Sequence, residues 1–92
     1  KHNVYFDGKV QSLGFTAEND WKQTLGVVSP GEYDFGVAEL EEHINVLHGT
    51  LIVNGKTVEA EGLTIVPKGT RVLVKATEVA AYHCQYFKSD ES

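Results

Sequence analysis

The chain has few basic residues, a single cysteine and no long apolar run. With 8 Lys and Arg against 13 Asp and Glu, its formal net charge is −5. It therefore lacks the basic stripe that neutralises the phosphates of a nucleic acid, although one or two local cations could still bind a small anion. The lone Cys84 excludes an intramolecular disulfide and fits a reducing compartment. No run approaches about 18 apolar residues, and no signal-peptide pattern opens the chain. These absences predict a cytoplasmic protein with neither a nucleic-acid nor a membrane partner.

The size of the chain limits how much it can bury alone. Ninety-two residues, 41% of them hydrophobic, are enough for one compact core. We predict a single domain over residues 1–92, with 88–92 as a polar tail. A second copy would cover further surface, so a homodimer is expected.

Helical periodicity is also missing. No segment keeps an apolar 3.6-residue spacing over three turns, and residues 38–47 could supply one helical turn at most. Short β-branched and apolar segments alternate instead with Gly and Pro corners, which is typical of an all-β barrel or sandwich. The clearest signal is Asn54-Gly55, a type I′ turn between two strands. The expected strands are 9–15, 21–29, two short strands within 30–49, then 50–53, 56–58, 63–66, 71–75 and 81–87.

Acidic and imidazole groups gather in one stretch, residues 30–49, PGEYDFGVAELEEHINVLHG. In an extended chain Glu39, Glu41 and His43 share a face that Glu42 opposes. A bulge would instead turn Glu42 inward. The cluster is either an acidic surface loop or the centre of function, and the residues alone leave both interpretations open. Cys84 is expected to be a small buried hydrophobe, because no histidine is placed to activate it.

The Gly and Pro spacing resembles the two-motif signature of the cupins, small jelly-roll β-barrels. Glu42, six residues and then Gly49 fit the first motif, and Pro67-Lys68-Gly69 fits the second. The metal-binding histidines of that signature are absent, because residues 37–39 are Val, Ala and Glu, and Val72 stands where the second motif places its His. The chain thus resembles a cupin without the usual metal site.

A narrower resemblance covers essentially the whole chain. The motifs Pro30-Gly-Glu-Tyr-x-Phe35 and Tyr82-x-Cys84-x-Tyr86 are similar to those of the small cupins called pyrimidine/purine nucleoside phosphorylases, as is the N-terminal segment 5–15. The resemblance implies an all-β, single-domain cupin-type jelly-roll β-barrel. It also implies phosphorolysis of purine and pyrimidine nucleosides to free base and ribose 1-phosphate, with broad specificity. Inorganic phosphate would be the co-substrate, and no metal or other cofactor is expected.

Such a reaction passes through a cationic sugar and needs carboxylates, a proton donor and an anion site. We assign catalysis to Glu39, Glu42 and His43. Substrate binding is assigned to Glu41, Tyr33 and Tyr82, and phosphate binding to Arg71 and Lys68, with Lys22 as the third cation. If Val72 and Val74 face inward, Arg71 faces out and reaches the site only from the rim or across a dimer interface; otherwise it is a solvated strand-edge charge.

Two other functions remain open. The first is a non-catalytic cupin that binds a small sugar or nucleoside without converting it. The second is a metal cupin that uses Glu39, Glu42, His43 and His83 as atypical ligands.

Overall fold

The computed structural model describes residues 2–5, 8–16 and 22–87. Within these residues it contains ten β-strands and no α-helix. The strands are β1 (His2–Tyr5), β2 (Val10–Thr16), β3 (Lys22–Val28), β4 (Gly31–Val37), β5 (Glu41–His48), β6 (Thr50–Val53), β7 (Lys56–Glu59), β8 (Leu63–Val66), β9 (Arg71–Ala76) and β10 (Ala80–Phe87). The all-β prediction is confirmed. The possible helical turn in 38–47 is absent, because β5 occupies most of that segment.

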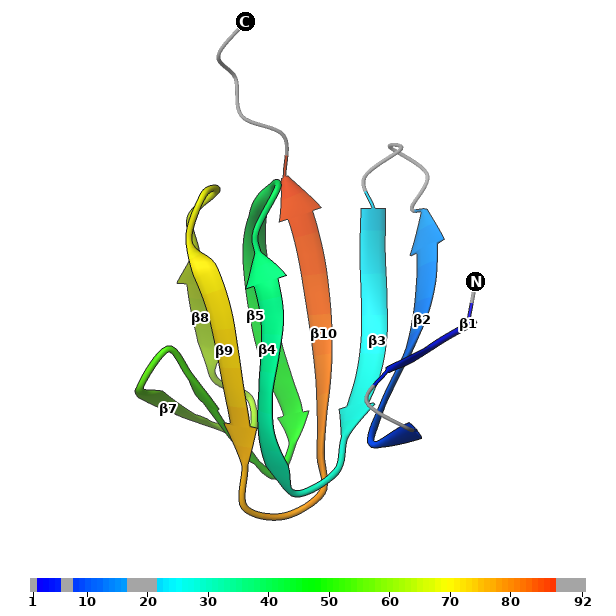
Figure 1. The fold of residues 1–92 in the computed structure, drawn as a ribbon, viewed down its shortest axis with the longest axis vertical. Coiled ribbons are helices and arrows are strands. Elements are labelled where there is room, and N and C mark those ends of the chain that lie inside the picture. Colours follow the sequence, from blue (N-terminus) through cyan, green and yellow to red (C-terminus); the bar gives the residue numbers. More distant parts are fainter. Residues whose placement is uncertain (1, 6–7, 17–21, 88–92) are drawn as a thin grey trace, which may run out of the picture.

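Two antiparallel sheets lie face to face. The larger has the strand order β1-β2-β3-β10-β5-β8, and the smaller has the order β4-β9-β6-β7. Figure 1 shows β4 and β9 in front of β5 and β8. The ladders of the described strands thus form two separate sheets, a flattened form of the predicted barrel.

The core fills the space between the sheets, and strand alternation explains its composition. In β9, Val72, Val74 and Ala76 are buried, whereas the residues between them are exposed. The same alternation holds in β3, where Thr24 and Val28 are buried and Leu25 is exposed. Among the described residues, the sixteen buried hydrophobic ones belong to one continuous cluster.

The predicted hairpin turn is present. Asn54 and Gly55 have φ of 51° and 83°, as a type I′ turn requires. Asn54 also ties the turn to β9. Its side-chain oxygen accepts a hydrogen bond from the backbone N–H of Leu73 at 2.8 Å, and its own N–H donates to the Leu73 carbonyl at 2.8 Å.

A bulge interrupts β4. Its ladder with β9 pairs Asp34 with Leu73 and then Val37 with Arg71, so Phe35 and Gly36 together oppose one residue. Gly36 has a φ of 87°, and its N–H donates to Asp34 Oδ1 at 2.9 Å. The bulge leaves Phe35 outside the regular ladder.

The outer face of the larger sheet carries exposed apolar side chains. Leu13 pairs with Leu25 across β2 and β3, and Leu63 and Ile65 project from β8 on the same side. Each is between 41% and 50% exposed. Within the described part of the chain, no helix is long and apolar enough to cross a membrane.

Candidate functional site

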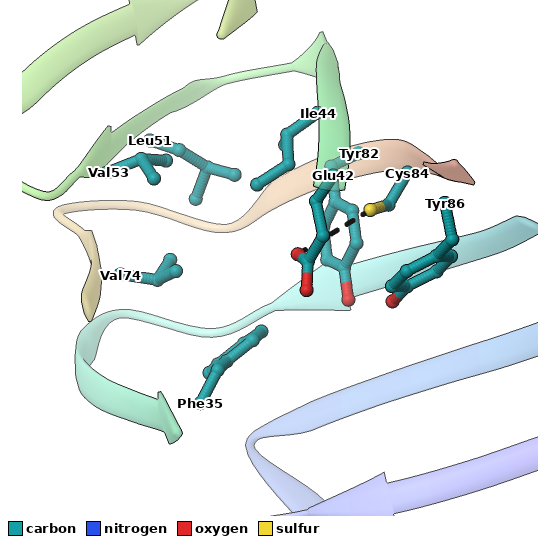
Figure 2. A pocket seen from close by; sticks show the side chains of 9 residues that line it. All are labelled: Phe35, Glu42, Ile44, Leu51, Val53, Val74, Tyr82, Cys84 and Tyr86. Atoms are coloured by element: carbon teal, nitrogen blue, oxygen red, sulfur yellow. Dashed lines mark hydrogen bonds between the residues drawn. The ribbon is translucent and has the colours of Figure 1, made fainter. Parts of the chain in front are cut away.

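A pocket lies between the sheets, where β4, β6 and β9 face β5 and β10 (Figure 2). Its free volume is about 20 Å³, room for about one water molecule. Eight of the lining residues are buried or half-buried, and Phe35, at 37% exposed, stands at the mouth. The nine lining residues are Phe35, Glu42, Ile44, Leu51, Val53, Val74, Tyr82, Cys84 and Tyr86.

Glu42 is the single carboxylate among these nine. It faces inward with Ile44 and Val46 of β5. The Cys84 thiol donates to Glu42 Oε1 at 3.7 Å, the dashed line in Figure 2. Burial raises the pKa of Glu42, while the Cys84 hydrogen bond and the charge of Lys22 partly oppose this rise. The pocket therefore holds a carboxyl whose neutral form persists closer to neutral pH than that of an exposed glutamate.

The neighbouring groups on β10 stay protonated. Burial, followed by the charge of Glu42, raises the pKa of the Cys84 thiol to about 12. Cys84 is 2% exposed, so it acts as a buried donor and not as a thiolate nucleophile. Burial also raises the pKa of Tyr86, whose hydroxyl lies 3.4 Å from Thr24 Oγ1 of β3. In Figure 2 the oxygens of Glu42, Tyr82 and Tyr86 point to the same side.

A cation stands at the edge of this group. Lys22 begins β3 on the face shared by the buried Thr24. Its ammonium nitrogen lies 5.4 Å from the centroid of the Tyr86 ring, within the range of a cation–π contact. Lys22 itself is exposed, so an incoming anion could reach it from solvent.

The structure divides the predicted acidic cluster between two faces. His43 Nε2 lies 2.6 Å from Glu41 Oε2, and the His43 ring is 4.3 Å from the Phe87 ring, all on the outer side of β5. Glu39 is exposed ahead of β5. Of the predicted catalytic residues, only Glu42 lines the pocket. Its inward orientation comes from strand alternation.

The predicted phosphate ligands lie elsewhere. Arg71 Nη1 donates to Asp34 Oδ1 at 3.1 Å and to Oδ2 at 2.8 Å on the outer side of the smaller sheet. Lys68 is exposed in the turn between β8 and β9. Neither lines the pocket. The alternation of Val72 and Val74 already indicated that Arg71 would face out.

The predicted substrate-binding tyrosines have different surroundings. Tyr82 lines the pocket, whereas Tyr33 is buried outside it and donates its hydroxyl to the Ser29 carbonyl at 2.8 Å. Tyr86 and Phe35 also line the pocket, although neither was assigned to the site from the sequence. The period-two spacing of Tyr82, Cys84 and Tyr86 placed Tyr86 on the same face as Tyr82, so this signal was available.

Atypical metal ligands do not converge. Among the described residues, no three His, Cys, Asp or Glu side chains are grouped to hold a metal ion. Glu42 faces the pocket, whereas His43 lies outside against Glu41, and His83 Nε2 lies 2.7 Å from Gln23 Oε1. The proposed set of Glu39, Glu42, His43 and His83 therefore does not surround one point.

A wider hollow of about 400 Å³ lies over the smaller sheet, lined by residues that include Glu32, Asp34, Leu73 and Lys75. Its charges are already engaged. Lys75 Nζ lies 3.8 Å from Glu32 Oε2, and Asp34 binds Arg71. The pocket around Glu42 is the better candidate, because it combines a desolvated carboxyl with aromatic walls.

The raised pKa of Glu42 predicts a pH-dependent stability difference. The folded state holds this proton more tightly than the unfolded chain does. The resulting stability is fully present below the unfolded pKa and is lost as the pH rises through the folded pKa. Glu42→Gln removes this titration, so relative to wild type it should gain stability above that pKa and gain nothing at acid pH. Thermal unfolding from about pH 4 to about pH 8 measures the difference. Glu39→Gln, at an exposed position, is the control, and a pH-independent difference for Glu42→Gln would contradict the prediction.

Comparison with known proteins agrees with this architecture. A sequence model described as pyrimidine/purine nucleoside phosphorylase matches residues 1–86. A relative of that name from Leptospira interrogans is 37% identical over 95 residues, covering 97% of this chain and 89% of the relative.

Solved structures share the fold of this chain. A Vibrio parahaemolyticus protein of unknown function superimposes with a TM-score of 0.86 at 32% identity, covering 95% of this chain and 97% of its own. The Clostridium difficile EutQ protein shares the fold, with a TM-score of 0.70 at 16% identity, and the match covers 88% of this chain and 69% of that one. The fold is the predicted cupin-type jelly roll. On the family match and the 37% identical relative, the chain belongs to the pyrimidine/purine nucleoside phosphorylase family.

Proposed function

We propose that this protein catalyses phosphorolysis of purine and pyrimidine nucleosides, giving free base and ribose 1-phosphate. The observation that carries the proposal is the half-buried Glu42 carboxyl, with its raised pKa, between tyrosines in the pocket. Names of relatives support the reaction at the level of the family. The broad range of bases and the independence from metal belong to the proposal.

The pocket walls favour a broad range of bases. Phe35, Tyr82 and Tyr86 offer aromatic rings, and aliphatic side chains make up most of the remainder. Every nucleobase has a π-face, so stacking discriminates weakly between purines and pyrimidines. Because the free volume is about 20 Å³, a base enters only if a wall residue moves, and Phe35 at the mouth is the best placed.

Glu42 has a definite task in this reaction. Neutral Glu42 donates its proton to the departing base as the glycosidic C–N bond breaks. A phosphate oxygen forms the new bond to the anomeric carbon. The proton that monohydrogen phosphate carries is released on ester formation and restores neutral Glu42. The net result moves one proton from phosphate to base, so no oxidant, reductant or metal is required.

Phosphate dependence tests the proposal. Purified protein should release uracil from uridine and hypoxanthine from inosine only when phosphate is present, with ribose 1-phosphate formed in equal amount. Chromatography of the products measures both. Equal release without phosphate would indicate hydrolysis and refute phosphorolysis. Binding of nucleoside without any release would favour the non-catalytic cupin instead.

We also propose that two copies associate through the outer face of the larger sheet. That face exposes Leu13, Leu25, Leu63 and Ile65 among uncharged residues such as Asn45. In an isologous dimer the same surface of each copy forms the contact, so charges of the same sign would meet there. A face with few charges avoids this repulsion in an acidic chain. Sedimentation should show a dimer that Leu25→Asp shifts to monomer, and a monomeric wild type would refute the association.

A further inference from the structure

We propose that Lys22, together with the hydroxyls of Thr24 and Tyr86, forms the phosphate subsite of the pocket. The inference rests on the proposed phosphorolysis and says where inorganic phosphate, its second substrate, binds. It replaces Arg71 and Lys68, the cations that the sequence favoured, by a residue that contacts Tyr86, one of the residues lining the pocket.

Strand register brings the three groups together. β3 and β10 pair antiparallel, with Thr24 opposite Cys84 and Gln23 opposite Gln85. Lys22 and Tyr86 each come one residue beyond this last pair of the ladder. Thr24 Oγ1 lies 3.4 Å from the Tyr86 hydroxyl, and the Lys22 ammonium lies 5.4 Å from the ring of the same tyrosine. One cation and two hydroxyls therefore lie together, and Tyr86 connects this group to the pocket that it lines.

These groups suit an oxyanion. An ammonium supplies a charge-assisted donor to phosphate, and each hydroxyl can donate once its hydrogen rotates. The long bond between Thr24 and Tyr86, at 3.4 Å, loses little if both hydroxyls turn to a bound anion. Lys22 is exposed, so its charge is solvated before phosphate arrives. The protein therefore does not have to keep a buried, unpaired cation in place before phosphate binds.

Arg71, Lys75 and Lys68 are less suited. Arg71 holds Asp34 with two hydrogen bonds, and Lys75 lies 3.8 Å from Glu32, both on the outer side of the smaller sheet. Lys68 occupies an exposed turn between β8 and β9, whereas Lys22 lies over the ring of Tyr86, which lines the pocket. Lys22 is the cation whose charge acts on Glu42. It is therefore close enough to the pocket to act on an anion there.

The arrangement couples the anion to the protonation of Glu42. Lys22 alone favours the Glu42 carboxylate, whereas a bound dianion would oppose that charge. Phosphate and the Glu42 proton should therefore bind together. The titratable and charged groups around this carboxyl are Tyr82, Cys84 and Tyr86 of β10 and Lys22 of β3. Sulfate reports this coupling well, because its charge is constant over the working pH range.

The test compares Lys22→Met with Lys22→Arg and with the matched control Lys68→Met, all as the full chain. Lys22→Met should raise KM for phosphate about tenfold or more, as loss of a charge-assisted contact implies, and leave KM for uridine nearly unchanged. Lys22→Arg should restore much of the loss, and Lys68→Met should behave as wild type. Sulfate should compete with phosphate in wild type, more weakly as pH rises, and its inhibition should be lost in Lys22→Met.

Calorimetric titration with inorganic phosphate separates this inference from the proposed function. Binding to wild type that Lys22→Met abolishes supports the subsite even if no base is released. If wild type catalyses phosphorolysis and Lys22→Met keeps its KM for phosphate and its sulfate inhibition, the subsite is refuted while the reaction stands. Circular dichroism of Lys22→Met checks the fold. Should that variant fail to fold, an unchanged KM for phosphate in Thr24→Val and Tyr86→Phe would refute the subsite.

Discussion

Glu42→Gln is expected to lower kcat for uridine phosphorolysis by about 10²–10⁴-fold, the usual contribution of a general acid. Glutamine keeps the size of the side chain and can still accept the Cys84 hydrogen bond, but it has no proton for the departing base. The fold should survive, because the variant removes a desolvated ionisable group without leaving a void. Steady-state rates with saturating phosphate measure the effect.

Two neighbours of Glu42 provide controls. Glu41→Gln and Glu39→Gln change carboxylates of the same segment, but Glu41 pairs with His43 on the outer face and Glu39 is exposed ahead of β5. Both should retain rates within a few-fold of wild type. If the Glu42→Gln variant keeps its kcat, a group other than Glu42 must donate the proton to the departing base. Loss of activity in Glu41→Gln equal to that in Glu42→Gln would place the reaction on the outer face.

Gly26→Ala is expected to destabilise the protein by about 1–3 kcal/mol through overpacking. A Cβ at position 26 would lie 2.3 Å from Tyr82 Cζ and 2.5 Å from its hydroxyl oxygen, so the ring has to move. Tyr82 also lines the pocket. The same substitution should therefore reduce nucleoside binding. Urea unfolding and KM for uridine measure the two effects.

A double-mutant cycle isolates the cause. In a Tyr82→Leu background the ring is gone, so Gly26→Ala should cost much less than it does in the wild type. Val27→Ala, on the exposed outer side of β3, tests the sensitivity of the strand itself and should change stability little. An equal cost of Gly26→Ala in both backgrounds would show that the close approach of Tyr82 is not the reason.

Local patterns predicted much of the fold. The Asn54-Gly55 dipeptide located one hairpin because its two residues tolerate positive φ, and the alternation of Val72 and Val74 correctly placed Arg71 outside. Both features depend on neighbouring residues alone. The short strand β1 was not among the expected elements. The predictions for the tail at 88–92 and for Trp21 fall outside the described residues.

The site was harder to predict, because a period-two pattern separates the faces of a strand without showing which face a pocket occupies. Glu41, Glu42 and His43 were correctly divided into opposite faces, yet their density on the chain suggested one cluster. Lys22 and Tyr86 are 64 positions apart in sequence and meet only through the pairing of β3 with β10. Such long-range register is set by the whole sheet, so no single segment of the sequence reveals it.

Because of the bulge in β4, the residue at the mouth of the pocket can change without disturbing the strand pairing that forms the pocket wall. Phe35 closes the mouth, yet it and Gly36 occupy the bulge, and the ladder resumes at Val37. A smaller residue at position 35 would enlarge the entrance without breaking a strand pair. For the proposed reaction, a substitution at position 35 alone would therefore change the range of bases that fit, while the scaffold that orients Glu42 stays the same.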